Sequence, residues 1–219
     1  MASRKRVLLV SASMVLLCLC IIVGATYALF TDTVTVENHL QSGDLDLGLY
    51  RTYLEYTVLD AEGRNDKEVI TTEVDFTETN IATANIFGIT DDRVIAPGNY
   101  VKATLEIRND GNVAFDYDAY IKLDSAVNDL AKQLQVTVTD ANGVKIGETK
   151  FLSEMTQGEN GYLITSGTSI GTSDNETFTV QILFVDYAED AAVDNDDAQD
   201  MDVSFDLIVN ATQNTEPNP

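Results

Sequence analysis

The chain has 219 residues with 36 acidic and 13 basic side chains, which gives a net charge of -23. This charge argues against a nucleic-acid-binding protein, because contacts to phosphates need clustered Lys and Arg side chains. Hydrophobic residues make up 44% of the chain, enough for a packed core, so the acidity belongs to the surface and the loops. A chain of this length predicts one main domain.

The N-terminus has the layout of an export signal. A basic triplet, Arg4–Arg6, precedes the apolar run Val7–Val23. The small side chains of Thr26 and Ala28 suit the two pockets of a signal peptidase, so we expect cleavage between Ala28 and Leu29. An uncleaved membrane anchor is the alternative, because a run of about 17 residues approaches the length that spans a bilayer.

Cleavage would change the chemistry of the mature chain. It removes three basic and no acidic residues, so 13 basic residues become 10 against 36 acidic ones and the net charge moves from -23 to -26. It also removes both cysteines, Cys18 and Cys20, and with them any disulfide or thiolate chemistry. Stability must then come from packing and from hydrogen bonds between strands, and contact with a membrane ends at cleavage.

Beyond the signal, apolar and polar residues alternate, which is typical of strands with one buried face. The alternating segments 101–107 and 115–123 flank the turn sequence Asn109–Asn112 and predict a hairpin. Segment 178–184 has a mostly uncharged polar face, which predicts a strand in the centre of a sheet or under a cover. The other expected strands are 136–138, 203–209, Leu45–Leu49 with apolar residues at odd positions, and Leu54–Val58 with apolar residues at even positions.

One segment has helical spacing instead, after the N-cap residue types Asp124 and Ser125. Its apolar residues are Val127, Leu130, Ala131 and Leu134. The whole pattern predicts an all-β fold: a two-sheet antiparallel β-sandwich of seven or eight strands, with one short helix and long acidic loops, preceded by an N-terminal signal helix. Periodicity leaves jelly-roll and immunoglobulin-like connectivity open. The expected divisions are a signal peptide at 1–28, an N-terminal segment at 29–43, the sandwich at 44–212 and a disordered tail at 213–219.

Three stretches of the sequence point to a known family. The first, Ala25–Thr33, surrounds the expected cleavage site and is followed by Asn38 and the motif Ser42–Leu47. In the second, Ala96-Pro97-Gly98 leads into a strand that ends in Arg108-Asn109-Asp110-Gly111, and the third is the closing strand with Asn210-Ala211-Thr212-Gln213. Together they resemble the TasA and camelysin family of exported proteins, most strongly over residues 24–49.

This resemblance implies a fold, a location and an activity. It implies a jelly-roll-like β-sandwich whose signal peptide is removed by a SipW-type signal peptidase. It also implies a secreted protein of the extracellular matrix or cell wall of a bacterium. TasA-like members polymerise into biofilm matrix fibres, in which the processed N-terminal segment acts as a donor strand that completes the sandwich of the next subunit.

The N-terminal segment itself suits strand addition. Phe30, Val34 and Val36 are apolar, Thr residues alternate with them, and neither Pro nor Gly interrupts residues 29–40. Cleavage after Ala28 would free this segment, so processing would switch on a head-to-tail assembly of identical subunits. The alternative is that the segment is simply the first strand of its own sandwich.

Enzyme chemistry has little support in the sequence. The camelysin branch has been described as metalloprotease-like, but His39 is the single histidine, so a zinc motif with two histidines is excluded. The string Gly167-Thr168-Ser169-Ile170-Gly171 matches a nucleophile elbow, yet no histidine follows it to complete a triad. The string lies in the Ser/Thr/Gly-rich stretch 165–173, which has the composition of a loop. We therefore expect a protein that is not an enzyme.

An acidic run covers residues 186–202 and holds eight carboxylates without a basic residue. Ca²⁺ takes oxygen ligands, so Asp194, Asp196 and Asp197 are the candidate ligands if the protein uses a cofactor at all. The run lacks the Gly and the distal Glu of an EF-hand loop, which favours a solvated connection between two strands. The function expected from the sequence is a structural subunit of matrix fibres. The alternatives are a monomeric surface-binding or adhesion module, with or without Ca²⁺ in its loops, and an exported metallopeptidase.

Overall fold

The computed structural model describes Met14 and residues 44–59, 62–77, 85–88, 94–124, 126–156, 158–187 and 193–214. The chain divides into two compact units, Met1–Ser42 and Gly43–Pro219, and the fold described here is that of the second. Apart from Met14, the predicted signal helix and the N-terminal segment 29–43 lie outside the described residues. No helix within the described ranges is long and apolar enough to cross a membrane.

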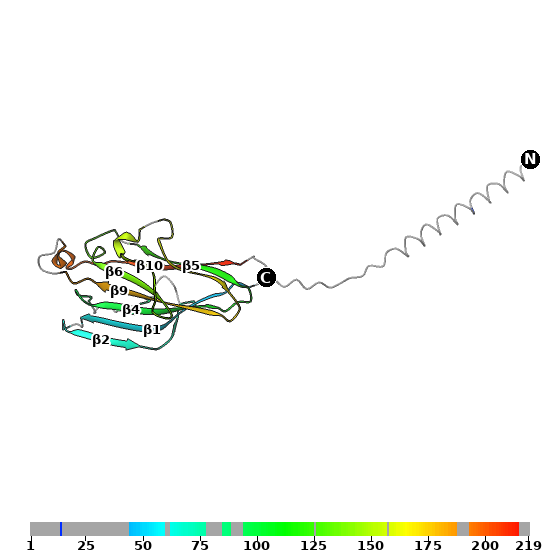
Figure 1. The fold of residues 1–219 in the computed structure, drawn as a ribbon, viewed down its shortest axis with the longest axis horizontal. Helices are drawn as coiled ribbons and strands as arrows, with labels where there is room; N and C mark the ends of the chain where they lie inside the picture. Colours follow the sequence, from blue (N-terminus) through cyan, green and yellow to red (C-terminus); the bar gives the residue numbers. More distant parts are fainter. Residues whose placement is uncertain are drawn as a thin grey trace, which may run out of the picture. The chain divides into compact units, whose positions relative to one another are not determined.

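Ten strands in the described part form two packed antiparallel sheets, so the predicted β-sandwich is confirmed (Figure 1). The large sheet has the order β2 (Asn65–Ile70), β1 (Leu47–Leu59), β4 (Tyr100–Asn109), β9 (Asn175–Phe184), β6 (Leu134–Asp140) and β7 (Lys145–Phe151), and the short β3 (Val74–Asp75) also pairs with β1. The small sheet has the order β10 (Phe205–Gln213), β5 (Phe115–Leu123) and β8 (Tyr162–Ile170).

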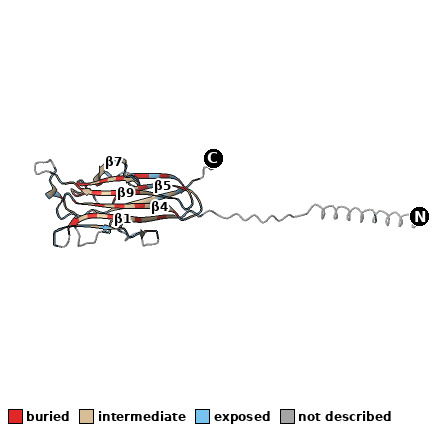
Figure 2. Cartoon of the chain, turned by 60° about the horizontal axis from the view of Figure 1, so that its bottom comes forward, coloured by how far each residue is buried: buried red, intermediate tan, exposed pale blue. Residues whose placement is uncertain are grey.

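The core lies between the two sheets, where buried positions alternate along the strands (Figure 2). The predicted alternations at 101–107 and 115–123 are confirmed as β4 and β5. The predicted hairpin is wrong, because β4 pairs with β1 and β9 whereas β5 pairs with β10 and β8. The connection at 110–114 carries the chain from one sheet to the other, so the two apolar faces oppose each other across the core. Alternation alone cannot distinguish that arrangement from a hairpin.

Strand β9 occupies the centre of the large sheet, between β4 and β6, as its uncharged polar face predicts. Thr179 is buried, and its hydroxyl lies 2.9 Å from the hydroxyl of Thr104 on β4. Strand β8 corrects another expectation. Residues 165–170, which have the composition of a loop, belong to this strand.

A β-bulge explains the change of parity in β1. The register against β4 shifts between Arg51 and Tyr53. Leu49 before the shift and Leu54 after it therefore face the same core, although one position is odd and the other even. The two short strands expected from the sequence are a single long one.

The predicted helix at 127–134 is not formed. Residues 129–133 make a turn, and the described part of the chain has no helix of seven or more residues, only the 3-10 helices η2 (Leu152–Glu154) and η3 (Asn195–Ala198). The side chain of Asn128 accepts a hydrogen bond from the N–H of Ala131 at 2.8 Å and starts the turn. Leu134 already pairs with Phe184 in the large sheet, which ends it. The apolar spacing is real, because Leu130, Ala131 and Leu134 are buried, but strand pairing supplies the partners that a helix would need.

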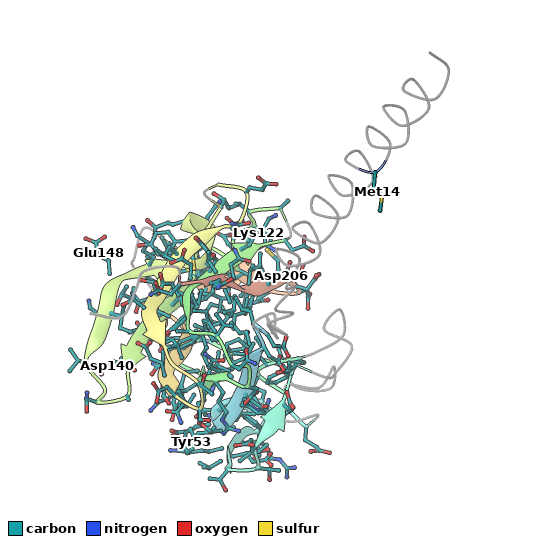
Figure 3. All side chains as sticks on the ribbon, turned by 90° about the vertical axis from the view of Figure 1, so that its right-hand side faces the viewer. Met14, Tyr53, Lys122, Asp140, Glu148 and Asp206 are labelled. Carbon is teal, nitrogen blue, oxygen red and sulfur yellow. The ribbon has the colours of Figure 1, made fainter. Side chains whose placement is uncertain are left out.

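A polar network ties three strands together on the outer face of the large sheet. The carboxylate of Glu55 on β1 accepts hydrogen bonds from Tyr100 at 2.7 Å and Tyr53 at 3.0 Å, and lies 3.0 Å from the ammonium of Lys67 on β2. The hydroxyl of Tyr100 and the ammonium of Lys67 lower the pKa of Glu55 from 4.5 to about 2. Figure 3 shows Tyr53 on this face and Lys122 and Asp206 on the opposite side, over the small sheet.

Replacing Glu55→Gln should make the stability of the domain less dependent on pH. The folded state holds this pKa below its unfolded value, so the carboxylate stabilises the fold above about pH 4.5 and loses that effect as the pH falls towards 2. We expect the variant to be less stable by about 1 kcal/mol at pH 7. The difference from the parent should shrink between pH 4.5 and 2. Urea unfolding at a series of pH values measures it, and a constant difference would contradict the assignment.

Candidate functional site

The described chain enters the sandwich through a backbone clamp at one end of the molecule. The N–H of Asp44 donates to the side chain of Asn112 at 2.7 Å, and the N–H of Asn112 donates back to the carbonyl of Asp44 at 2.9 Å. The N–H of Asp110 donates to the carbonyl of Asp46 at 3.0 Å. We call residues 44–46 and 109–112 the clamp. It fixes the point at which the N-terminal segment joins the domain.

Asn109 holds the clamp from inside. Its side chain is 1% exposed and donates to the carbonyls of Val113 at 2.9 Å and Ile170 at 2.8 Å, while its oxygen accepts from the N–H of Gly111 at 3.0 Å. Gly111 fits because a Cβ there would lie 2.3 Å from the carbonyl oxygen of Asp44. Two of the stretches that carry the resemblance, Ser42–Leu47 and Arg108–Gly111, therefore meet in space at residues 44–46 and 110–111.

Strand β10 forms one edge of the small sheet and pairs with β5 alone among the described strands. None of its nine residues is buried. Four of its odd-numbered residues are apolar and lie opposite buried residues of β5, so their side chains face the core, yet they are only partly buried. These residues are Phe205, Leu207, Val209 and Ala211. The inward side chains of β10 are therefore less completely covered than those of β5.

The backbone N–H and C=O groups of the same odd residues point away from β5. The N–H of Asp124 donates to the carbonyl of Ser204, and the N–H of Asn214 donates to the carbonyl of Ala114, at 3.0 and 2.9 Å. Residues opposite each other in an antiparallel ladder alternate between exchanging and not exchanging hydrogen bonds. Even residues of β10 therefore bond to β5, and the N–H and C=O groups of the odd residues from 205 to 213 face the free edge.

The other three sheet edges differ from that of β10. Strand β2 carries Asp66, Lys67 and Glu68, and β7 carries Lys145, Glu148 and Lys150 beside Gly147 at φ 63°. Charges and irregular backbone of this kind hinder pairing with another chain. Strand β8 is uncharged, but Ile164, Thr165 and Ile170 are buried, so the core beneath it is covered. Strand β10 has a single charge, Asp206, and its core-facing side chains are only partly buried.

A short turn, Asn85–Gly88, packs next to the start of β10. The ring of Phe87 lies 5.9 Å from that of Phe205. Ile86 and Phe87 contact both hydrophobic clusters of the core, the larger one between the sheets and the smaller one around Leu54.

Arg51 is a buried cation behind this turn. It is 7% exposed and donates from Nη1 to the carbonyl of Ile86 at 2.6 Å, and its guanidinium lies 5.9 Å from the ring centre of Phe76. Its Nε is buried without a hydrogen-bond partner, and no ion pair involves it among the described residues. Burial lowers the pKa of this guanidinium because no opposite charge offsets the loss of solvation. The sequence signal for Arg51 is weak: one basic residue between two apolar alternations of opposite parity.

Most of the site residues predicted from the sequence lie outside the described part of the chain, namely Ala28, Leu29, Phe30, Val34 and Val36. The three candidate calcium ligands are described. Asp194 caps η3 by accepting from the N–H of Asp196 at 3.0 Å, Asp196 accepts from Gln199 at 2.6 Å, and Asp197 is exposed. No group of three or more His, Cys, Asp or Glu side chains within the described ranges could hold a metal ion. Glu189 and Asp190 of the same run fall outside those ranges, so the calcium site stays a prediction.

The string at 167–171 has a structural explanation. Gly167 lies in β8 opposite Tyr117 of β5, and a Cβ there would come within 2.3 Å of the tyrosine ring. The glycine therefore makes room for a buried aromatic side chain. The serine of the string stands in a strand, not at a sharp turn from a strand into a helix.

The fold and these features define a two-sheet β-sandwich with one open edge. No protein-family model matches the chain, and no curated protein matches it either.

Replacing Gly111→Ala should loosen the clamp. The added methyl group would meet the carbonyl oxygen of Asp44 at 2.3 Å and the amide nitrogen of Asp46 at 2.7 Å, and both are backbone atoms. We expect a loss of about 1–3 kcal/mol in the free energy of unfolding. Gly171→Ala is the matched control, because its methyl group would meet the movable carboxylate of Asp174. Equal stability of the two variants in urea would show that the clamp adds nothing.

Proposed function

We propose that this protein is a secreted structural subunit of extracellular or biofilm matrix fibres. In this proposal a signal peptidase cleaves between Ala28 and Leu29, and the freed segment 29–43 of one copy adds as a donor strand to the β10 edge of the next. A jelly-roll-like connectivity, the location in the matrix or cell wall of a bacterium and the absence of enzymatic activity belong to the same proposal. The observation that carries it is the edge of β10, where no described strand pairs with the outward backbone groups and the core-facing side chains are only partly buried.

The chemistry of the segment complements that edge. An added strand would pair with the outward N–H and C=O groups of β10, and its apolar side chains would cover the half-exposed core beneath. Burying a side chain such as Phe30, Val34 or Val36 contributes about 1.5–3 kcal/mol each. Repulsion between the acidic subunits opposes this gain, but at physiological salt it is screened beyond about 8 Å.

The direction of the chain favours a neighbour over the protein's own edge. The clamp lies at the end of the sandwich where β10 finishes, because Leu47 pairs with Asn109 and Gln213 pairs with Phe115. A segment that ends at residue 43 and folds back beside its own β10 would have to run parallel to it. Every ladder in the described sheets is antiparallel. A neighbour's edge leaves the antiparallel orientation open, and such a head-to-tail contact builds filaments when its rotation does not close.

Protein that begins at Leu29 should form filaments visible by electron microscopy, whereas protein that lacks residues 29–40 should stay monomeric. The shortened chain keeps the clamp and all described strands, so its melting temperature as a monomer should be close to that of the longer chain. Filaments from the shortened chain would overturn the role of the segment. A longer chain that stays monomeric at high concentration would overturn the proposed function.

Two proline substitutions test the β10 edge separately from the fold. Ala211→Pro removes an N–H that faces the free edge, so the ladder with β5 should survive and filament formation should stop. Asn210→Pro removes an N–H that bonds to β5 and should cost the monomer at least about 1 kcal/mol. Urea unfolding and electron microscopy on both variants distinguish the two effects. Normal filaments from Ala211→Pro would place the assembly edge elsewhere.

A further inference from the structure

Among the described residues, Arg51 has no charged partner, although the protein is rich in carboxylates. The chain has 36 acidic side chains, yet the guanidinium has a backbone carbonyl as its acceptor and a buried Nε with none. A neutral carbonyl does not offset the cost of burying a cation, which is large unless an opposite charge pairs with it. In the isolated domain, no described side chain therefore neutralises the positive charge of Arg51.

The open edge lies next to this cation. Arg51 faces the core from β1, opposite Leu105 of β4. Its hydrogen-bond partner Ile86 precedes Phe87, whose ring contacts Phe205 at the start of β10. A strand added to β10 runs about 4.8 Å from it, in the place beside Phe205 that Phe87 now fills. Side chains on the inner face of that strand would point towards Arg51.

The N-terminal segment carries a carboxylate on the matching face. Side chains two residues apart share one face of a strand, so in an added strand Phe30, Asp32, Val34 and Val36 would lie on one face. Turning the apolar residues inward would therefore bury Asp32 with them. Glu37 is at an odd position and would face solvent. Asp32 needs a buried cation, and Arg51 needs an anion.

We propose that the carboxylate of Asp32 from a second copy of this chain pairs with Arg51 when the segment adds to the β10 edge. The inference rests on the proposed function and adds to it the residue that determines specificity. The added strand would displace Phe87 from Phe205. The carboxylate of Asp32 would then replace the carbonyl of Ile86 as the hydrogen-bond acceptor of the Arg51 guanidinium. A pair formed at one point along the strand fixes its register, because a slip of one residue turns Asp32 to solvent and leaves Arg51 unpaired.

A double-mutant cycle on protein that begins at Leu29 tests the pair. The variants are Asp32→Asn, Arg51→Gln and the two combined, with Glu37→Gln as a control that removes the same charge from the opposite face. Breaking a buried charge pair typically costs 2–5 kcal/mol, so each single variant should raise the critical concentration for filaments at least about 30-fold. The double variant should be no worse than Arg51→Gln alone, because no unpaired carboxylate is then buried. Glu37→Gln should stay within about threefold of the parent.

Three outcomes would overturn the pairing. The first is an Asp32→Asn variant that assembles as well as Glu37→Gln, which leaves strand addition intact but without this contact. The second is a double variant whose loss equals the sum of the single losses. The third is a lower melting temperature of the dilute Asp32→Asn monomer, which would place the pair within one chain. Parent protein that forms no filaments at all would instead overturn the proposed function.

Discussion

Backbone groups at the edge of a sheet need partners, and the rest of this structure depends on how each edge meets that need. On β2 and β7, charged side chains and a left-handed glycine make the edges poor templates. Strand β10 has neither protection, and the odd residues that present free N–H and C=O groups also present core-facing side chains. One added strand would satisfy both.

The open edge follows from the unequal size of the two sheets. The three strands of the small sheet cannot cover the whole inner face of a seven-stranded sheet. The turn at 85–88 covers the part of β1 that the small sheet leaves uncovered. Arg51 lies in this part, between Leu49 of the larger cluster and Leu54 of the smaller one. A turn offers its carbonyls to a cation but no charge, so the contact with Ile86 orients the guanidinium without neutralising it.

The sequence predicts the strands that bury one face and misses the strands that do not. Strands β4, β5 and β9 alternate cleanly, because one side of each is apolar and fully covered. Strand β2 has no such pattern, since it is charged and lies at an edge, where pairing comes from β1 and not from its own burial. The hairpin between 101–107 and 115–123 could not be rejected from sequence either. Apolar faces that lie side by side and apolar faces that oppose each other have the same alternation.

The residue types of the candidate site could be predicted from the sequence, but their arrangement in space could not. The apolar face of residues 30–36 is plain in the sequence, whereas the open edge of β10 depends on which strands pair with it, a long-range property. The clamp adds the decisive step. The clamp places residue 44, which follows the N-terminal segment, at the end of the sandwich where β10 finishes. If the segment folded back onto its own β10, the two strands would therefore be parallel in an otherwise antiparallel sheet. In the proposed assembly, the contacts that hold the domain together would therefore also favour addition of the segment to another copy.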